Sequence, residues 1–163
     1  KVKPDYYIYF RGCNLLEEAD LELLDVSAVT NFQHSFYNCS KLTTKSLKIS
    51  SWKPQNLEFT NYTFYGCSGL TSLDLSKWKM DKVISVPGMF NGCSSLETLD
   101  LSGWNLAQAN WHNVTHSGKE ERCMFYGCKK LKTIRMVGCS NATMNLVKRD
   151  LGVAGINPTI VTR

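Results

Sequence analysis

The chain has 163 residues, of which 43% are apolar, and its formal net charge is +5. This length corresponds to about one domain with a single hydrophobic core. No apolar run approaches the roughly 18 residues of a membrane-spanning helix. The basic residues are scattered rather than gathered in a stripe that would contact phosphates. We therefore expect one folded domain, residues 1–163, with no transmembrane segment and no nucleic-acid partner.

Residues 1–9 (KVKPDYYIY) contain a short aromatic, strand-like run after Pro4. Two interpretations stay open: a cap that shields the first unit of the domain, or the remnant of a preceding repeat. This segment has no signal-peptide pattern, which leaves room for an export signal or a lipid anchor upstream of Lys1.

A repeated motif organises the rest of the chain. Residues 64–78 read FYGCSGLTSLDLSKW, and residues 90–104 read FNGCSSLETLDLSGW. Looser copies begin at Phe10, Phe36 and Phe125, so the Phe-to-Phe spacings are 26, 28, 26 and 35 residues. An insertion at about residues 105–122 accounts for the last spacing. A fixed period in this range predicts a solenoid of five stacked repeats, here residues 10–139.

Each repeat is predicted to contribute one strand and one return segment. The alternating apolar pairs have period two, which is typical of a strand with both residues facing inward. These pairs are Leu21 and Leu23, Leu47 and Ile49, Leu73 and Leu75, Leu99 and Leu101, and Ile134 and Met136. Successive strands should form one short parallel sheet. In the return segments, apolar residues such as Val29, Phe32 and Phe36 recur at helical spacing, which predicts a short helix or helical turn.

Residues 140–163 are predicted to close the C-terminal end of the stack. Ser140 or Asn141 can cap a helix from about Ala142 to Leu151, which Gly152 and Gly155 would end. Residues 159–162 (TIVT) are β-branched and predict a final strand.

Five of the seven cysteines share one position in the repeat and should stack as a column: Cys13, Cys39, Cys67, Cys93 and Cys128. Parallel side chains at strand spacing favour free thiols over disulfides between neighbours. A bridge between Cys123 and Cys139 stays open.

Residues His112, His116, Cys123 and Cys128 are compatible in type with zinc, but their spacing matches no zinc signature. No nucleophile motif or phosphate loop is present. We expect no metal, no cofactor and no enzymatic activity.

Candidate binding residues lie at positions that the repeat does not explain. The outward positions between the paired apolar residues form the series Glu22, Lys48, Asp74, Asp100 and Arg135. One interpretation is a solvated surface with cross-strand ion pairs, Lys48–Asp74 and Asp100–Arg135. The other is a ligand-binding face, since solenoids bind on their broad surfaces. In the insertion, Trp111 and its neighbour His112 are a second candidate, because Trp111 lies outside the Trp52, Trp78 and Trp104 series that we expect in the core.

The signatures L-x-x-L-D-L-S-x-W and F-x-G-C-x-x-L resemble those of the BspA-like leucine-rich-repeat proteins of bacterial surfaces, from about Phe10 to Cys139. The resemblance implies a right-handed α/β leucine-rich-repeat solenoid in a secreted or lipid-anchored surface protein. It also implies adhesion to a protein or glycan partner. The chain departs from the pattern where Val26 and Cys139 replace Trp, and at the insertion. The function we expect is a non-enzymatic binding or adhesion module; the alternative is a structural spacer within a larger surface protein.

Overall fold

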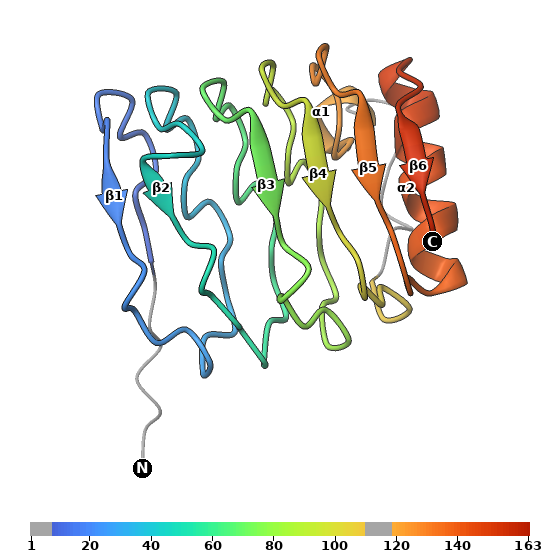
Figure 1. Cartoon of the computed structure of the whole chain (residues 1–163), viewed down its shortest axis with the longest axis horizontal. Helices are drawn as coiled ribbons and strands as arrows, with labels where there is room; N and C mark the ends of the chain where they lie inside the picture. Colours follow the sequence, from blue (N-terminus) through green and yellow to red (C-terminus); the bar gives the residue numbers. More distant parts are fainter. Residues whose placement is uncertain (1–7, 110–118) are drawn as a thin grey trace.

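The computed structural model describes residues 8–109 and 119–163. In chain order the elements are β1 (Ala19–Asp20), β2 (Leu47–Lys48), β3 (Ser72–Asp74), β4 (Thr98–Asp100), α1 (Lys119–Arg122), β5 (Thr133–Arg135), α2 (Asn141–Ala154) and β6 (Thr159–Val161). Figure 1 shows the strands side by side from β1 to β6, with α2 packed at the C-terminal end. We call one copy of the repeat, with its strand and its return segment, a coil. Trp111 and His112 lie outside the described residues, as do residues 1–7 of the predicted N-terminal cap.

The strands pair in parallel, each with the strand of the next coil. Leu73 is in register with Leu99, Leu99 with Ile134, and Ile134 with Ile160. These residues face the core because alternate residues of a strand point to opposite sides of a sheet.

The sequence predicts one sheet, but the structure divides the strands into two, β1–β2 and β3–β4–β5–β6. Cys39 and Leu47 are eight residues apart, whereas Cys67 and Leu73 are six apart. The two extra residues form a turn between Thr43 and Ser46, where the Ser46 N–H donates to the Thr43 carbonyl over 3.1 Å. The Thr44 hydroxyl then bridges the gap: it accepts from the N–H groups of Thr71 (3.0 Å) and Ser72 (2.9 Å) and donates to the Ser72 carbonyl (2.8 Å).

The predicted register of the first repeat is wrong by two residues. Ala19, not Leu21, pairs with Leu47, and Asp20 pairs with Lys48. Leu21 is half-buried and Leu23 is 99% exposed. The spacing from Cys13 to Ala19 is six residues, the same as from Cys67 to Leu73. The first coil therefore follows the regular repeat with Ala in place of Leu.

The predicted helices of the return segments are also wrong for the described coils: within these residues, the only helix of a return segment is α1, which lies in the insertion. The other return segments are tight turns whose alternate N–H groups donate to the next coil. For example, Phe32 donates to the Phe59 carbonyl (2.9 Å) and Phe36 to the Thr63 carbonyl (2.9 Å). His34, between them, also donates to the next coil, to the Asn61 carbonyl (3.0 Å), whereas Ser35 donates within its own turn to the Phe32 carbonyl (3.1 Å). Because each coil satisfies its backbone through its neighbour, no helix is needed there.

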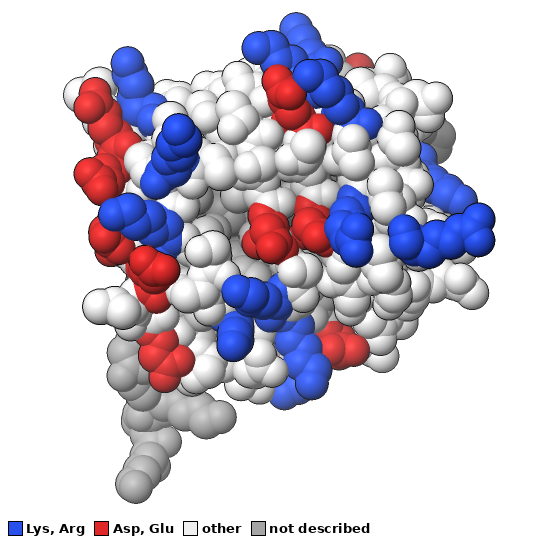
Figure 2. All heavy atoms as spheres, in the orientation of Figure 1, with Lys and Arg blue, Asp and Glu red and all other residues white. Residues whose placement is uncertain are grey.

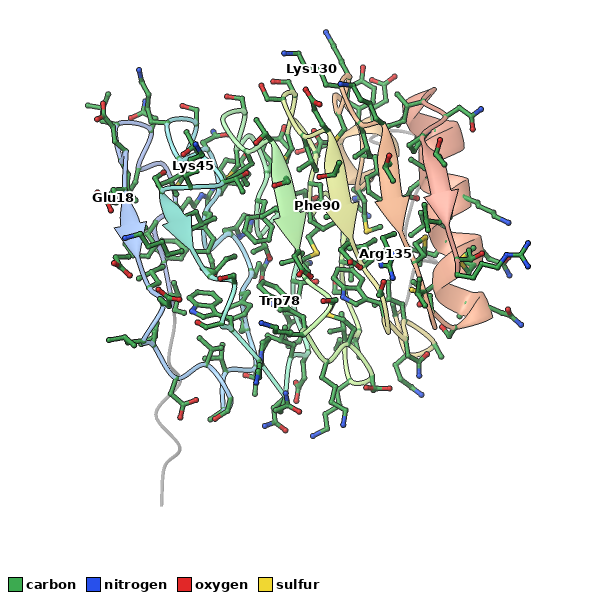
Figure 3. All side chains as sticks on the ribbon, in the orientation of Figure 1. Glu18, Lys45, Trp78, Phe90, Lys130 and Arg135 are labelled. Carbon is green, nitrogen blue, oxygen red and sulfur yellow. The ribbon has the colours of Figure 1, made fainter. Side chains whose placement is uncertain are left out.

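Columns of identical residues fill the core; Phe90 and Trp78, labelled in Figure 3, belong to two of them. The rings of Phe10, Phe36, Phe64, Phe90 and Phe125 form one stack, with centroid distances of 5.7, 5.7, 6.1 and 5.9 Å. All seven cysteines are free thiols. In the Cys column each thiol from Cys39 onward donates to the carbonyl of the preceding coil's Phe, as Cys67 does to Phe36 over 3.0 Å. The column thus uses Cys both as a small apolar side chain and as a weak donor.

The Trp residues of the repeat are buried, as the sequence predicted. The indole N–H groups of Trp52 and Trp104 donate to the carbonyls of Leu21 (2.9 Å) and Leu75 (3.0 Å) in the preceding coil. Cys139, which replaces Trp in the fifth repeat, donates its thiol to the Leu101 carbonyl over 3.1 Å. The substitution therefore keeps a donor at this corner of the coil.

The C-terminal end of the stack is closed by α2 and β6. Ser140 caps α2, its hydroxyl accepting from the Thr143 N–H, and Gly155 ends the helix at a φ of 67°. The buried Thr143 hydroxyl donates to the Trp104 carbonyl (3.0 Å) and accepts from the Leu106 N–H (2.9 Å). The buried carboxylate of Asp150 accepts from the Met124 N–H over 2.9 Å. These contacts attach the helix to the fourth and fifth coils.

Candidate binding surface

The outward face of the β3–β4–β5 sheet contains a shallow open depression of about 380 Å³. Its polar rim comes from alternate residues of three strands: Ser72, Asp74, Thr98, Asp100, Thr133 and Arg135. The parallel register places Asp74, Asp100 and Arg135 in one row and the three hydroxyl residues in another. In Figure 2, acidic and basic side chains lie next to one another across the middle of this face. The structure thus brings together three of the predicted binding residues.

The charges in this row are unevenly compensated. The Arg135 Nε lies 3.5 Å from Asp100 Oδ2. Oδ1 of Asp74 accepts from the hydroxyl (2.6 Å) and the N–H (3.0 Å) of Ser76, and this bonding, with the side-chain contact foremost, holds the pKa of Asp74 below its ordinary value. Within the described part of the chain, Asp74 Oδ2 makes no hydrogen bond or ion pair. Asp74 faces Asp100 directly, and two like charges at such a position oppose folding. A ligand that supplies a cation or several hydroxyl donors would relieve this repulsion.

Asp74 and Asp100 also have a structural role. Asp100 Oδ1 accepts from the Ser102 N–H over 2.9 Å, as Asp74 does from Ser76, so each carboxylate ends its strand with an Asx turn. The turn requires an oxygen but not a charge. Arg135 accounts for the charge of Asp100, so the charge of Asp74 is the feature that the scaffold does not explain.

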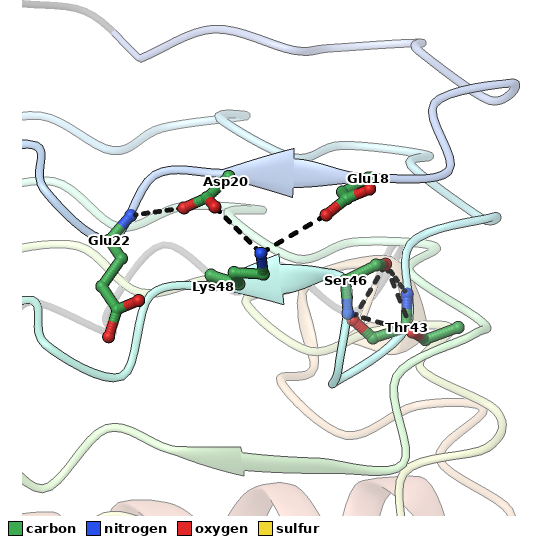
Figure 4. A network of polar contacts seen from close by, with 6 residues as sticks. All are labelled: Glu18, Asp20, Glu22, Thr43, Ser46 and Lys48. Carbon is green, nitrogen blue, oxygen red and sulfur yellow. Dashed lines mark hydrogen bonds and ion pairs between the residues drawn. The ribbon is translucent and has the colours of Figure 1, made fainter.

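Lys48 does not join this row. Its ammonium pairs with Asp20 Oδ2 (2.9 Å) and Glu18 Oε1 (3.4 Å) on β1 and the residue before it (Figure 4). The hydrogen bond to Lys48 is the main reason that the pKa of Asp20 is lowered, and it likewise raises the pKa of Lys48. The predicted Lys48–Asp74 pair is therefore wrong, whereas the predicted Asp100–Arg135 pair is present.

Glu22 lies outside the predicted series because the register of the first coil is shifted. Asp20 takes its place opposite Lys48, and the Glu22 N–H donates to Asp20 Oδ1 over 3.4 Å. The sequence signal that locates Asp20 is the six-residue spacing from the repeated Cys to the inward residue before it, Ala19, which the first coil shares with the third and fourth coils.

A second surface, on the return segments, was not predicted from the sequence. His34 stacks on Tyr62 (5.2 Å between centroids) and Tyr37 on Tyr65 (4.6 Å), and the two pairs meet edge to face. We call these four half-buried rings the aromatic block. The Arg11 guanidinium lies 5.1 Å from the Tyr37 centroid, at one end of the block.

The backbone of the aromatic block is strained. His34 and Tyr62 have φ values of 59° and 54°, in the left-handed region. The third coil has Gly88 at the same position, with a φ of 59°, and a Cβ there would lie 2.4 Å from the Tyr62 ring. Bulky residues rarely adopt this conformation. His34 and Tyr62 each lie two residues before a Phe of the repeat, Phe36 or Phe64. This shared repeat position is the sequence signal that could have brought the two rings together.

The electrostatics of the aromatic block favour the neutral forms of His34, Tyr62 and Tyr65. Burial, followed by the charge of Glu121, raises the pKa of Tyr62, while burial and then Tyr37 raise that of Tyr65. Burial and the nearby Arg11 lower the pKa of His34. The ring faces are occupied by one another, so the block offers ring edges and hydroxyl groups, which suit a protein contact better than a stacked sugar.

The buried thiols of the Cys column stay protonated and are therefore unreactive. Burial raises the pKa of Cys39 to about 11 and that of Cys128 to about 12, and it raises the pKa of Cys67 and Cys93 further. Nucleophilic attack and metal ligation need the thiolate. These side chains act as protonated donors within the core. In the described segments, no group of three or more His, Cys, Asp or Glu side chains is placed to hold a metal ion.

A search of curated proteins and a search of solved structures found no match to this chain. Neither helix within residues 8–109 and 119–163 has the length and apolar character to cross a membrane. A family model described as "Mycoplasma protein of unknown function, DUF285" matches residues 5–133, which include the four strands from β1 to β4 and the start of β5. Because this match covers most of the repeats, the chain belongs to the DUF285 family.

Proposed function

We propose that this domain is a non-enzymatic binding or adhesion module, displayed on a bacterial cell surface or secreted, and that its ligand is a protein or a glycan. In this proposal the coils form a leucine-rich-repeat solenoid of the BspA-like kind, and the depression on the β3–β4–β5 face binds the ligand. The family is described from Mycoplasma, which agrees with a bacterial protein.

The observation that supports the proposal is the row of Asp74, Asp100 and Arg135 beside the hydroxyl groups of Ser72, Thr98 and Thr133. Convergent polar groups over an apolar floor are typical of ligand sites. Within the described residues, one oxygen of the Asp74 carboxylate has no hydrogen-bond partner at the edge of this depression, so it can accept a hydrogen bond from a ligand. The mixed charge of the row also argues against nucleic acid, which would need a continuous basic surface.

The alternative is a structural spacer that holds other domains away from the cell. A spacer needs no ligand-binding depression, whereas the β3–β4–β5 face contains one. This feature favours binding over the spacer.

The free thiols do not conflict with export. Extracellular cysteines usually form disulfides, but oxidation proceeds through an accessible thiolate. Six of the seven cysteines are buried or half-buried, and only Cys13 is exposed. A membrane-impermeant maleimide should therefore label the native protein on intact cells at Cys13. Labelling only after lysis would contradict the surface location.

The binding site can be tested with Asp74→Asn, Asp100→Asn and Arg135→Gln combined. Asn still accepts the Ser76 and Ser102 hydrogen bonds, so the turns stay while the charges go. We expect this variant to bind at least ten times more weakly to any ligand that the wild type selects from a glycan array or a panel of purified extracellular proteins. Biolayer interferometry would measure the change, and the exposed Lys53→Ala is the matched control.

Two results would contradict the proposal. A ligand held equally by wild type and triple variant would place the site elsewhere. No ligand in either screen, for a folded wild type, would favour the spacer.

A further inference from the structure

Every coil has a tight turn that runs from the Phe of the repeat to the Cys three residues later, and we call it the Phe–Cys turn. The Cys N–H donates to the carbonyl of the Phe, as Cys128 does to Phe125 over 3.0 Å. The residue before the Cys has a positive φ, which is 78° at Gly127. Glycine suits this conformation because it has no Cβ. The same turn therefore recurs in all five coils.

The N–H of the residue before the Cys links each coil to the next. In four of the five turns it donates to the carbonyl of the residue that follows the next coil's Phe. The donor and acceptor pairs are Gly12 and Tyr37, Asn38 and Tyr65, Gly66 and Asn91, and Gly92 and Tyr126, at 2.6–2.8 Å.

The fifth turn differs from the other four. Within residues 8–109 and 119–163, the Gly127 N–H has no acceptor. A backbone donor requires a partner, which in the other turns is a peptide carbonyl. Gly127 is only partly buried, so its N–H is accessible to a carbonyl group from outside the fold.

The C-terminal cap covers this part of the stack without filling the space beside the turn. β6 pairs with β5, and the Asp150 carboxylate of α2 accepts from the Met124 N–H. Between the fifth Phe–Cys turn and the end of α2 lies an open depression of about 480 Å³, which Gly127 lines. Its apolar lining comes from Gly92, Cys128, Ala154 and Ile156.

The charge beside this depression is positive. Lys129 lines it, and Lys130 follows in the turn before β5 (Figure 3). In the described part of the chain, Lys129 forms no ion pair and no carboxylate lines the depression. A hydrogen bond to Glu120, in α1, raises the pKa of the Tyr126 hydroxyl, so this nearby acid is already engaged. Figure 2 shows basic side chains gathered above β4 and β5.

We propose that the fifth Phe–Cys turn binds an acidic extended segment of a partner protein. A carbonyl of the segment accepts from the Gly127 N–H, an apolar side chain enters the depression, and a carboxylate pairs with Lys129. Proteins capture extended peptides by backbone hydrogen bonds and side-chain pockets of this kind, and complementary charge selects the partner. This site shares no lining residue with the β3–β4–β5 depression, so it does not depend on the function proposed above.

A peptide segment fits this site better than a free anion does. The acceptor in the four paired turns is always a peptide carbonyl. A small anion such as phosphate could contact Lys129 and Gly127, but it would leave the apolar part of the depression uncovered. Burial of that apolar surface favours a ligand with an apolar side chain.

The chain itself supplies the design of a probe. Residues 124–131 read MFYGCKKL, and this segment provides the carbonyl that accepts from the Gly92 N–H. The acidic probe MFYGSEEL carries Cys128→Ser, Lys129→Glu and Lys130→Glu. Its basic counterpart, MFYGSKKL, carries Cys128→Ser alone.

Titration of the acidic probe into the isotope-labelled 163-residue chain should shift the amide resonances of residues 126–130 and 154–156 saturably. The Gly127 amide proton should move downfield as its hydrogen bond forms. The basic probe should bind at least ten times more weakly, because its charges repel Lys129. Raising the salt concentration should weaken the acidic probe.

Matched variants of the chain test the same charge from the side of the protein. Lys129→Glu should weaken the acidic probe at least ten-fold and strengthen the basic probe by a similar factor. Lys53→Glu makes the same charge change at an exposed residue of the second coil and should leave both affinities unchanged.

Several outcomes would overturn the proposal. Equal binding of the two probes, or no saturable shift with the acidic one, would remove the acidic segment as the ligand. Inorganic phosphate that binds at the same resonances as tightly as the acidic probe would leave a site for an anion only. Slow hydrogen exchange at Gly127 in the probe-free chain would show that the protein itself supplies the acceptor. A concentration-dependent doubling of mass in light scattering, without probe, would make a second copy the occupant.

Discussion

The first coil and the interior coils have the same repeat but different surroundings. Phe90 lies between two rings of the Phe stack, whereas among the described residues Phe10 stacks on one ring of it, that of Phe36. Cys128 is buried and donates to Phe90, while Cys13 is exposed. In a stack, the contribution of a residue therefore depends on its neighbouring coils as much as on its own type. Substitutions at equivalent positions of the two regions test this dependence.

The largest difference is expected at the Phe stack. Phe90→Ala removes a fully buried ring and should lower the free energy of unfolding by about 3–5 kcal/mol. Phe10→Ala removes a partly buried ring and should lower it by about 1–2 kcal/mol. Urea denaturation followed by circular dichroism measures both. Equal losses would mean that the first coil is covered in solution.

The Cys column should make the protein sensitive to alkali. Cys128 has an ordinary pKa of 9.0 when unfolded and a folded pKa of about 12, raised by burial. Below pH 9 both states are protonated, so stability does not depend on this group. Between pH 9 and about 12 only the unfolded thiol ionises, which lowers the free energy of unfolding by about 1.4 kcal/mol per pH unit.

The slope of the unfolding free energy against pH can be compared between variants of the interior coils and of the first coil. Unfolding free energies from pH 8 to 10.5 should fall less steeply for Cys128→Ala than for the wild type. Cys13→Ala, at the equivalent position of the first coil, is the matched control. A wild-type slope in Cys128→Ala would show that the interior thiol ionises as readily as a free one.

The Thr44 hydroxyl offers a third comparison, at the gap between the two sheets. It makes three hydrogen bonds to Thr71 and Ser72, in the next coil. Thr44→Val keeps the shape and removes these bonds, and it should lower the free energy of unfolding by about 1–2 kcal/mol. Faster hydrogen exchange at Ser72 would localise the effect. The exposed Thr30→Val, whose side chain bridges no gap, should change stability by less than about 0.5 kcal/mol.

How much of this arrangement the sequence predicts depends on the regularity of each repeat. The register of β3 and β4 follows from the near-identical copies at residues 64–104. The C-terminal helix begins at the predicted Ser140 cap, but it continues through Gly152 to Ala154 and ends at Gly155 alone. The return segments could not be predicted in the same way: apolar residues at i, i+3 and i+7 fit a helix, but they also fit tight turns that donate to the next coil.

The candidate site was predictable in part for the same reason. Asp74, Asp100 and Arg135 follow regular repeats and form one row. Lys48 follows the repeat with two extra residues, and its sheet is separate. The aromatic block forms through contacts between neighbouring coils, at residues with left-handed backbone such as His34 and Tyr62. A helical interpretation of the return segments does not predict these contacts.

The smallest effect is expected at Leu23, and it decides the register of the first coil. The alternation of Leu21 and Leu23 predicts a buried pair, which would make Leu23→Ala as damaging as Leu101→Ala, at about 2–5 kcal/mol. The structure pairs Ala19 with Leu47 and leaves Leu23 99% exposed, whereas Leu101 is fully buried. Leu23→Ala should therefore change the free energy of unfolding by no more than about 0.5 kcal/mol. A loss above 2 kcal/mol, measured beside Leu101→Ala in the same urea series, would move β1 two residues along the chain and place Glu22, rather than Asp20, opposite Lys48.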